Sequence, residues 1–230
     1  MVIGNGMLAK AFSFFKNDPE IIIFASGVSN SREMNDVNFK REAQLLDDTM
    51  NQNAEKLIVY FSTCSIYDKS VKDKSYVLHK IRMEEKVKRY NKFYIFRLSQ
   101  VVGETQSPTL VRVFFHSILK GEEININKFS TRNLIDVADV FTIVSFLIRN
   151  KLYINEITNI ATPFNKSVLD IALMMADIIG CELKYKLLNV GSAYDINIDK
   201  IDMFIDVFHD EYLHDLLSNY DNSLSKNNRS

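Results

Sequence analysis

The sequence has little of what marks fibrous, disordered or disulfide-bonded chains. Its 230 residues include no tryptophan, only 2 cysteines, 3 prolines and 7 glycines, while 47% are hydrophobic. Those proportions exclude collagen, mucin-like stalks and disordered chains. Cys64 and Cys181 cannot build a disulfide framework, and neither has a cysteine or histidine at metal-ligand spacing. We therefore predict a globular protein held together by a hydrophobic core.

An excess of one charge and a long apolar run are also lacking. Lys plus Arg number 28 and Asp plus Glu 29, which gives a net charge of -1 and no global basic field for nucleic acid or an anionic membrane. The longest apolar runs are far shorter than the roughly 18 residues of a membrane helix. No export signal and no His pair at zinc-helix spacing are visible. We expect a cytoplasmic protein with no nucleic-acid partner, no membrane partner and no metal site.

Short β-branched runs alternate along the chain with amphipathic stretches, a pattern that predicts a parallel sheet covered by helices. The fold class is α/β. The predicted strands span residues 1–3, 20–25, 56–62, 92–97 and 156–160. The predicted helices span residues 7–16, 36–51, 76–90, 109–119, 136–149 and 167–179. Ser167 is the expected N-cap of the last helix, and Gly180 is expected just beyond its end.

The regular alternation is interrupted twice, which predicts a small second lobe built from two separate stretches. We assign residues 1–103 plus 132–162 to a dinucleotide-binding core and residues 104–131 plus 163–221 to a substrate lobe. Residues 222–230 are polar and without aromatics, so a flexible tail is expected there.

A glycine turn follows the first predicted strand and opens the first predicted helix. In the run 4–9, with the sequence GNGMLA, Gly4 permits a tight turn, Gly6 lets a pyrophosphate approach the backbone and Ala9 allows close helix packing. An ordinary strand-to-helix turn is the alternative. The acidic residue expected about 20 residues further on in a dinucleotide site is missing. Ala25, Ser26 and Gly27 stand there instead, and Ser26 with Arg32 would suit a 2'-phosphate.

Tyr76 and Lys80 lie four residues apart in a predicted helix, so both face the same side. There the ammonium could lower the pKa of the phenol from about 10, which would make Tyr76 a general acid or base. Thr63, at the end of the preceding strand, could hydrogen-bond the same substrate oxygen. The alternative is a surface Tyr and Lys pair of little energetic value.

Taken in order, these segments resemble the extended short-chain dehydrogenase/reductase family, the NAD(P)-dependent epimerases, dehydratases and reductases that act on nucleotide sugars. The matching segments are residues 4–9, residues 61–67 with Thr63, the pair Tyr76 and Lys80, residues 96–103, and residues 132–140. The resemblance implies a reduced Rossmann-like, doubly wound parallel sheet. The family's second and third strands are missing, because only about ten residues separate the first helix from the run 20–29, which is similar to the family's fourth strand.

The resemblance also implies a cofactor, a substrate and the residues that hold them. NAD or NADP is the expected cofactor and a nucleotide sugar the expected substrate, and a homodimer is left open. The implied catalytic residues are Thr63, Tyr76 and Lys80. The implied cofactor contacts are Gly4, Asn5, Gly6, Met7, Leu8, Ala25, Ser26, Gly27, Ser62, Tyr76 and Lys80. The implied substrate contacts are Thr63, Cys64, Ser65, Gln100 and Arg132, with Arg132 as the arginine for the substrate diphosphate and a surface pair with Asp136 or Asp139 as its alternative.

The residues after Thr63 bear on the reaction. Sugar dehydratases of this family place an acid pair there, and this chain has Cys64 and Ser65, neither of which replaces a carboxylate. A 4,6-dehydratase is therefore disfavoured. We place reduction of a keto-sugar ahead of epimerisation because the substrate lobe is short. A non-catalytic binding module of the same fold remains the competing class, since the sheet is truncated.

Overall fold

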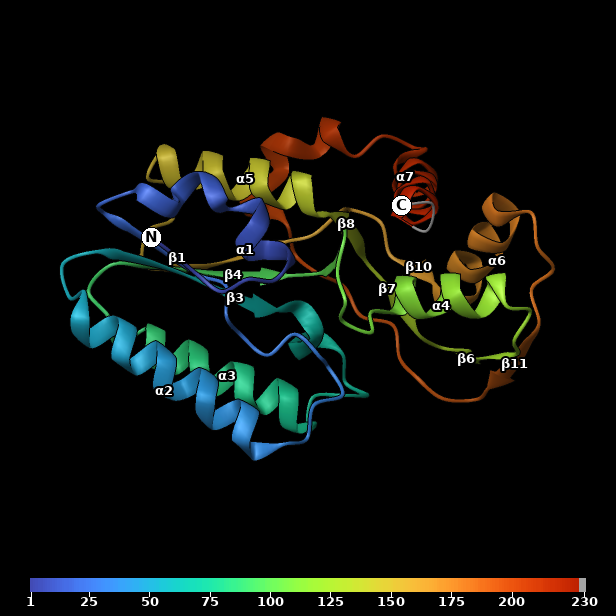
Figure 1. Ribbon diagram of the computed structural model, residues 1–230, viewed down its shortest axis with the longest axis horizontal. Helices are drawn as coiled ribbons and strands as arrows, with labels where there is room; N and C mark the ends of the chain where they lie inside the picture. The colour runs from blue at the N-terminus through green and yellow to red at the C-terminus, as the bar shows by residue number, and fades with distance from the viewer. Residues whose placement is uncertain (228–230) are drawn as a thin grey trace.

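Five parallel strands form the central sheet in the computed structural model, which describes residues 1–227 (Figure 1). Their order across the sheet is β1-β2-β3-β4-β9. The strands are β1 (Val2–Ile3), β2 (Ile21–Phe24), β3 (Leu57–Thr63), β4 (Phe93–Leu98) and β9 (Glu156–Ile160). All five predicted strands are present, and every neighbouring pair is parallel.

Both faces of this sheet are buried, which explains why its strands are apolar at consecutive positions. Val59 and Phe61 of β3 point to the face covered by α1 and α5, whereas Ile58 and Tyr60 point to the face covered by α2 and α3. Figure 1 shows these two helix layers above and below the strands. The predicted α/β architecture, with helices on either side of a parallel sheet, is confirmed.

The helices lie close to their predicted positions. They are α1 (Met7–Ala11), α2 (Asp36–Gln52), α3 (Ser75–Val87), α4 (Leu110–Leu119), α5 (Val137–Arg149), α6 (Val168–Ile179) and α7 (Tyr212–Asn227). Ser167 caps α6 by accepting from the Asp170 N–H, and Gly180 ends it with φ 73°. Both caps were predicted from the residue types alone.

The first helix is shorter than predicted. α1 ends at Ala11, and a tighter 3-10 helix, Ser13–Asn17, replaces the expected second half. Residues three apart in a 3-10 helix lie above one another, so Phe12 and Phe15 both reach the core and are almost completely buried. The tighter winding therefore serves the packing of two aromatic rings.

The sheet is reduced at the β1 side, as predicted. β1 forms ladder bonds with β2 alone in the described part of the chain, and the 3-10 helix that ends at Asn17 leads almost directly into β2. β1 is therefore an edge strand, and its edge is where further strands of a larger doubly wound sheet would lie.

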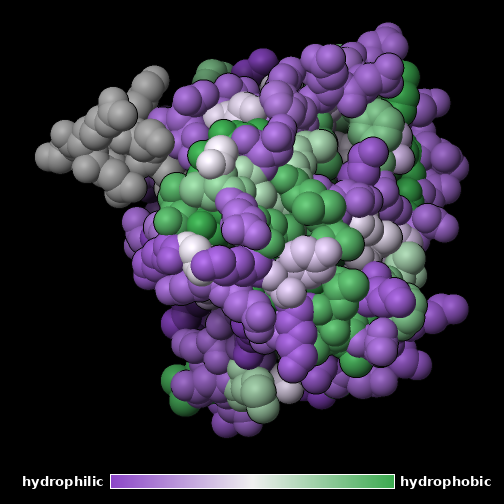
Figure 2. Space-filling view, turned by 90° about the vertical axis from the view of Figure 1, so that its right-hand side faces the viewer, coloured by the Kyte–Doolittle hydropathy of each residue, from purple (hydrophilic) through white to green (hydrophobic). Residues whose placement is uncertain are grey.

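The second lobe consists of short pairs of strands and three helices, α4, α6 and α7. Its remaining elements are β6 (Ile124–Asn127), β7 (Thr131–Arg132), β10 (Lys166–Ser167) and β11 (Tyr185–Leu188). β6 pairs with β11 and β7 with β10, so residues 124–132 and 166–188, far apart in the sequence, contribute strands that lie side by side. Figure 2 looks onto the end of the molecule that carries these elements and shows apolar side chains gathered in patches that are bordered by polar ones.

The C-terminal stretch differs from the prediction. α7 reaches Asn227, so residues 222–227, expected in a flexible tail, are helical, and residues 228–230 lie outside the described part. The buried residues of α7 recur at helical spacing, a signal that could have revealed this helix; they are Leu213, Leu216, Leu217 and Tyr220.

The remaining short elements are β5 (Gln100–Val102), β8 (Leu134–Asp136) and two 3-10 helices, Cys64–Tyr67 and Asp199–Val207. The assignment of residue ranges to a core and a lobe remains a prediction.

Candidate active site

The glycine turn leaves the carboxyl end of β1 beside the carboxyl end of β2. Gly4 has φ 126°, and a Cβ built there would lie 2.5 Å from the Ala25 carbonyl oxygen. Only glycine tolerates both the conformation and the close approach. Gly6 differs, because a Cβ there would have no heavy atom within 4 Å. The turn is therefore tight against β2 at Gly4 and open at Gly6.

The other predicted cofactor residues of this turn are divided between surface and core. Asn5 is exposed, and Leu8 packs against the main core. Met7, the first residue of α1, reaches Gly103, where its sulfur would lie 2.8 Å from an added Cβ. The backbone from Gly4 to Gly6 is thus the exposed part of the turn.

At the end of β3, the hydroxyl of Thr63 lies within hydrogen-bonding reach of the Tyr76 phenol. Its Oγ1 accepts a hydrogen bond from the Ser65 N–H at 3.1 Å, which fixes the side chain at the start of the 3-10 helix. Burial raises the pKa of Tyr76 to about 12, a hydrogen bond with Thr63 acts to lower it, and the charge of Glu42 raises it. The structure therefore brings Thr63 and Tyr76 together and holds the phenol in its protonated form.

Lys80 lies in the buried interior below Tyr76, and it binds a carboxylate that sequence reasoning missed. Its Nζ donates to Glu42 Oε1 at 3.0 Å and to the Tyr60 hydroxyl at 3.1 Å. The expected net lowering of the pKa of Tyr76 is corrected, because burial of the phenol raises that pKa. The physical reason is burial, which disfavours the charged phenolate more than the neutral phenol.

Glu42 is completely buried on α2. Its carboxylate also accepts from the Tyr60 hydroxyl at 2.7 Å and from the Val28 N–H at 2.6 Å, and it lies 3.0 Å from His79 Nε2. Burial alone would raise the pKa of Glu42, but Lys80, His79 and the other donors more than offset this and leave it at about 2. The signal in the sequence is the spacing of Phe39, Glu42 and Leu46, which marks one face of α2.

Glu42 predicts an acid-labile fold. Because its pKa falls from 4.5 in the unfolded chain to about 2 in the folded protein, its contribution is complete above pH 4.5 and is lost as the pH falls toward 2. The shift corresponds to about 3 kcal/mol. Denaturant unfolding measured between pH 6 and pH 2 should show this loss, and Glu42→Gln should flatten the slope. An equal slope in both proteins would contradict the assignment.

A second buried network lies at the ends of β3 and β4. Glu84 is fully buried and receives two guanidinium bonds from Arg97, at 2.9 and 2.6 Å, together with the hydroxyl of Ser62 at 2.5 Å. Ser62, a predicted cofactor contact, is thereby turned toward Glu84. Cys64 is fully buried and its thiol donates to the Arg97 carbonyl, while burial raises its pKa to about 12. We do not retain Cys64 as a substrate contact.

Arg132, on β7, lies beside the buried carboxylate of Asp68. Its NH1 is 3.8 Å from Asp68 Oδ2 and donates to its neighbour's carbonyl, so the pairing that we weighed with Asp136 or Asp139 does not form. Those two carboxylates have other donors: Asp136 caps α5 and Asp139 accepts from Tyr212. Arg132 keeps part of its guanidinium accessible, since the side chain is 25% exposed.

Tyr194 joins this group and was not predicted. Burial raises its pKa to about 12, and the neighbouring charges that act on it include Arg132 and Asp68. Asp68 also accepts from Ser192 at 2.6 Å, which ties the segment around Tyr194 to the loop after β3. Gln100, the remaining predicted substrate residue, is half-buried and its N–H donates to the Asn133 carbonyl.

The loop after β2 carries the other predicted cofactor residues. Ser26 receives the guanidinium of Arg41, at 3.4 Å to its hydroxyl and 3.2 Å to its carbonyl. Arg41, and not the predicted Arg32, is therefore the cation beside Ser26. Gly27 faces the interior, where an added Cβ would lie 2.7 Å from Lys80 Nζ.

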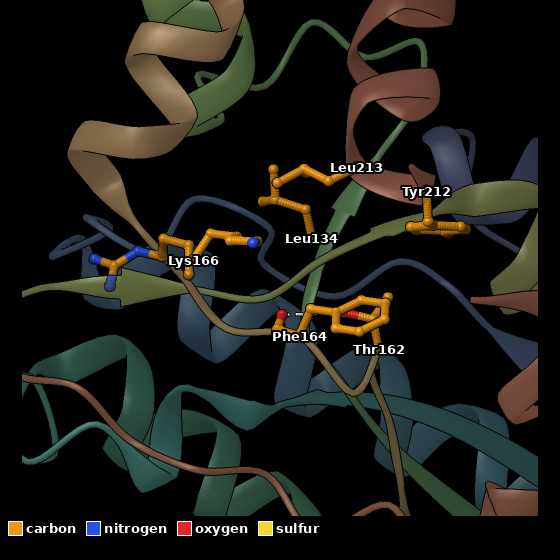
Figure 3. Close-up of a pocket in the computed structure, with 7 residues that line it drawn as sticks. Leu134, Thr162, Phe164, Lys166, Tyr212 and Leu213 are labelled. Atoms are coloured by element: carbon orange, nitrogen blue, oxygen red, sulfur yellow. Dashed lines mark hydrogen bonds between the residues drawn. The ribbon is translucent and has the colours of Figure 1, made fainter. Parts of the chain in front are cut away.

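Two hollows lie near these residues. The smaller, of about 10 Å³, is shown in Figure 3, where Leu134, Phe164, Tyr212 and Leu213 surround it and Thr162 bonds the Phe164 carbonyl. It has room for about one water molecule and not for a sugar. The larger, of about 390 Å³, is a groove between α2 and α3 lined by Phe39 and His79 among others.

Neither a metal site nor a membrane span is found in the described part of the chain. Within residues 1–227, no cluster of three His, Cys, Asp or Glu side chains could hold a metal ion. None of the helices there combines the length and apolar character that crossing a bilayer demands.

Solved structures with the same fold are nucleotide-sugar enzymes. The dTDP-glucose 4,6-dehydratase of Bacillus anthracis, solved with NAD, superposes with a TM-score of 0.75 at 15% identity, over 97% of this chain and 78% of that one. The UDP-glucuronic acid 4-epimerase of Bacillus cereus, solved with UDP-glucuronic acid and NAD, gives 0.73 at 20% identity, over 92% and 77%. At these identities the likeness shows the fold alone.

The family is shown by the sequence itself. Residues 8–161 match the family model described as the NAD dependent epimerase/dehydratase family. The match covers the strand that ends at Thr63, the pair Tyr76 and Lys80, and Arg132, while the glycine turn at residues 4–6 precedes it. The matched range contains the whole central sheet except β1. The chain therefore belongs to the NAD dependent epimerase/dehydratase family.

Proposed function

We propose that the protein reduces the keto group of a nucleotide-linked sugar with NAD(P)H. The observation that carries this proposal is the buried, protonated phenol of Tyr76 beside the Thr63 hydroxyl, at the carboxyl end of a sheet whose first turn is rich in glycine. Ligands of open parallel sheets bind at that end. Membership of the family supports an enzyme, and the similar structures with bound NAD support the class of cofactor.

The glycine turn fits the pyrophosphate of such a cofactor. The exposed backbone from Gly4 to Gly6 lacks a side chain at the point where a phosphate would approach, and Arg41 beside Ser26 adds a positive charge. Because β1 is an edge strand, we expect the adenosine half to gain fewer contacts than the pyrophosphate. When bound, the nicotinamide supplies the hydride.

Tyr76 would supply the proton. As hydride adds to the keto carbon, the carbonyl oxygen becomes an alkoxide, and Tyr76 donates its proton to that oxygen to give the alcohol. Thr63 would orient the same oxygen through its hydroxyl. A phenol with a pKa of about 12 is far weaker as an acid than in water, but an alkoxide is a stronger base still, so the transfer remains downhill.

Epimerisation is the second candidate, supported by the epimerases among the similar structures. It requires the phenol to begin as a base, because the sugar must first be oxidised. With a pKa of about 12, roughly one phenol in 10⁵ is ionised at pH 7. This favours the proton-donating direction. Dehydration is disfavoured further, since Cys64 is buried with its thiol protonated.

A panel of nucleotide-linked keto-sugars tests the proposal, with NADH and NADPH oxidation followed at 340 nm. We expect turnover with at least one of them and none with the corresponding free sugars. Interconversion of two nucleotide sugars without net oxidation of the cofactor would establish the epimerase instead. Cofactor binding without any turnover would favour the binding module.

Arg132 is proposed to bind the diphosphate of the substrate, because a guanidinium offers a planar fork to phosphate oxygens. Arg132→Ala should raise KM for the nucleotide sugar about tenfold or more, the loss of one charge-assisted contact of about 1.5 to 3 kcal/mol. Thermal stability should hardly change, because Asp68 keeps donors from Ser70 and Ser192. Unaltered KM, or a lower melting temperature as the sole defect, would make Arg132 structural.

A further inference from the structure

The Lys80 ammonium has all three of its hydrogens directed at acceptors inside the protein. Glu42 Oε1 lies at 3.0 Å, the Tyr60 hydroxyl at 3.1 Å and the Phe61 carbonyl at 3.4 Å. An ammonium has three donors and no acceptor, so this set is complete. The side chain is 4% exposed and Glu42 is not exposed at all, so water does not compete for these bonds.

Glu42 is held as firmly as the lysine that it binds. Oε1 faces Tyr60 and Lys80, while Oε2 faces the Val28 N–H and His79 Nε2. Since these donors come from β3, α3 and the loop after β2, the carboxylate cannot move without breaking contacts to all three. It is thus a fixed negative charge placed directly against the positive charge of Lys80.

The charged groups around Tyr76 come from every element packed against it. α2 contributes Glu42, β3 contributes Tyr60, and α3 contributes His79, Lys80 and Glu84, while Arg97 of β4 is paired with Glu84. Lys80 and His79 both face Glu42, and Arg97 faces Glu84. Lys80, one helical turn from Tyr76, is the cation whose field would otherwise favour a phenolate.

We propose that Glu42 is a positioning residue of this site: it holds the Lys80 ammonium in a closed set of acceptors and neutralises it, so that Tyr76 keeps its proton and serves as a donor. This proposal rests on the proposed function only in assigning the proton of Tyr76 to the keto-sugar oxygen, because the charge arrangement itself can be tested without substrate. Glu42 acts through Lys80 and touches no reacting atom.

Titration of Tyr76 in the free protein is the test. With tyrosine labelled at 13Cζ, the Tyr76 resonance is identified by its loss in Tyr76→Phe, and its ionisation is followed by NMR from pH 7 to above pH 12. We expect Glu42→Gln to lower the ionisation midpoint by about one pH unit or more, which is about a tenfold larger phenolate fraction at a given pH. In Glu42→Gln with Lys80→Met, the wild-type behaviour should return, because no ammonium remains.

Asp47→Asn is the matched control. Asp47 also lies on α2 and binds a lysine of α3, Lys86, at 2.6 Å, but this pair is about one third exposed. Asp47→Asn removes one negative charge from α2, as Glu42→Gln does, and should leave the ionisation midpoint of Tyr76 unchanged. A Glu42→Gln protein with the wild-type titration, or a double variant shifted as far as the single one, would overturn the proposal.

If Glu42→Gln does not fold, Glu42→Asp takes its place, because it keeps the charge and withdraws it by one methylene. The midpoint should then move in the same direction, and an unchanged midpoint would refute the role of Glu42. Failure of the proposed function can be distinguished from failure of this proposal. In that case the ionisation midpoint of Tyr76 would shift as expected in Glu42→Gln, while the protein reduces no keto-sugar.

Discussion

Tyr76→Phe should lower kcat for keto-sugar reduction by about 10² to 10⁴, the usual contribution of a positioned general acid. The variant keeps the aromatic ring, and Tyr76 is 8% exposed and clusters with Val28, Phe39 and Val77, so the melting temperature should stay near that of the wild type. Steady-state kinetics with the best substrate of the panel, together with circular dichroism, provide the measurement.

Tyr94→Phe is the control for Tyr76→Phe. Tyr94 is a fully buried tyrosine of β4 whose hydroxyl makes one long bond of 3.3 Å to the Leu147 carbonyl, on the other face of the sheet. It should retain wild-type turnover. If Tyr76→Phe is as active as Tyr94→Phe, Tyr76 is not the proton donor and the proposed reaction loses its acid.

Gly6→Val should weaken cofactor binding by about tenfold or more, a loss of about 1.4 kcal/mol. A branched side chain at Gly6 would fill the open space that we assign to the pyrophosphate, and no heavy atom of the protein within 4 Å opposes the first carbon. The fold should therefore tolerate the substitution. Calorimetric titration with NADH and NADPH measures the effect directly.

Gly4→Ala separates loss of binding from loss of folding. At Gly4 an added Cβ meets the Ala25 carbonyl oxygen and φ is 126°, so this variant should unfold at a lower temperature. Gly6→Val should not. Cofactor affinity unchanged in a folded Gly6→Val protein would show that the turn only links β1 to α1.

The sheet could be predicted from the sequence because its strands are buried on both faces. Such strands are continuous apolar runs, as in residues 21–25 and 57–61, and they stand out from polar surroundings. The absence of two strands could also be predicted, because the short spacing between the first helix and the second apolar run leaves no room for them. Helix caps such as Ser167 and Gly180 could also be predicted, because a cap depends on the residue type and the local backbone geometry.

The partner of Lys80 could not be predicted, because it depends on a contact between residues 38 positions apart. Glu42 lies in a charged stretch of α2 that resembles a solvated helix face, and its burial follows from how α2 docks on the sheet. The same limit applies to Asp68, Ser192 and Tyr194. Burial of the phenol raises the pKa of Tyr76, and helical spacing alone does not reveal that burial.

The position of β1 has a consequence for the topology of the chain. The connections β1-α1-β2 and β2-α2-β3 step across the sheet in the same direction, yet α1 covers one face and α2 the other (Figure 1). Two crossovers of that kind have opposite hands, so one of them is left-handed, which parallel sheets almost always avoid. The turn that we assign to the cofactor is carried by a two-residue edge strand within this unusual unit. A ligand bound at this turn would stabilise the edge strand β1 by its binding free energy. The edge of the sheet would therefore become more ordered as the occupancy of the site rises.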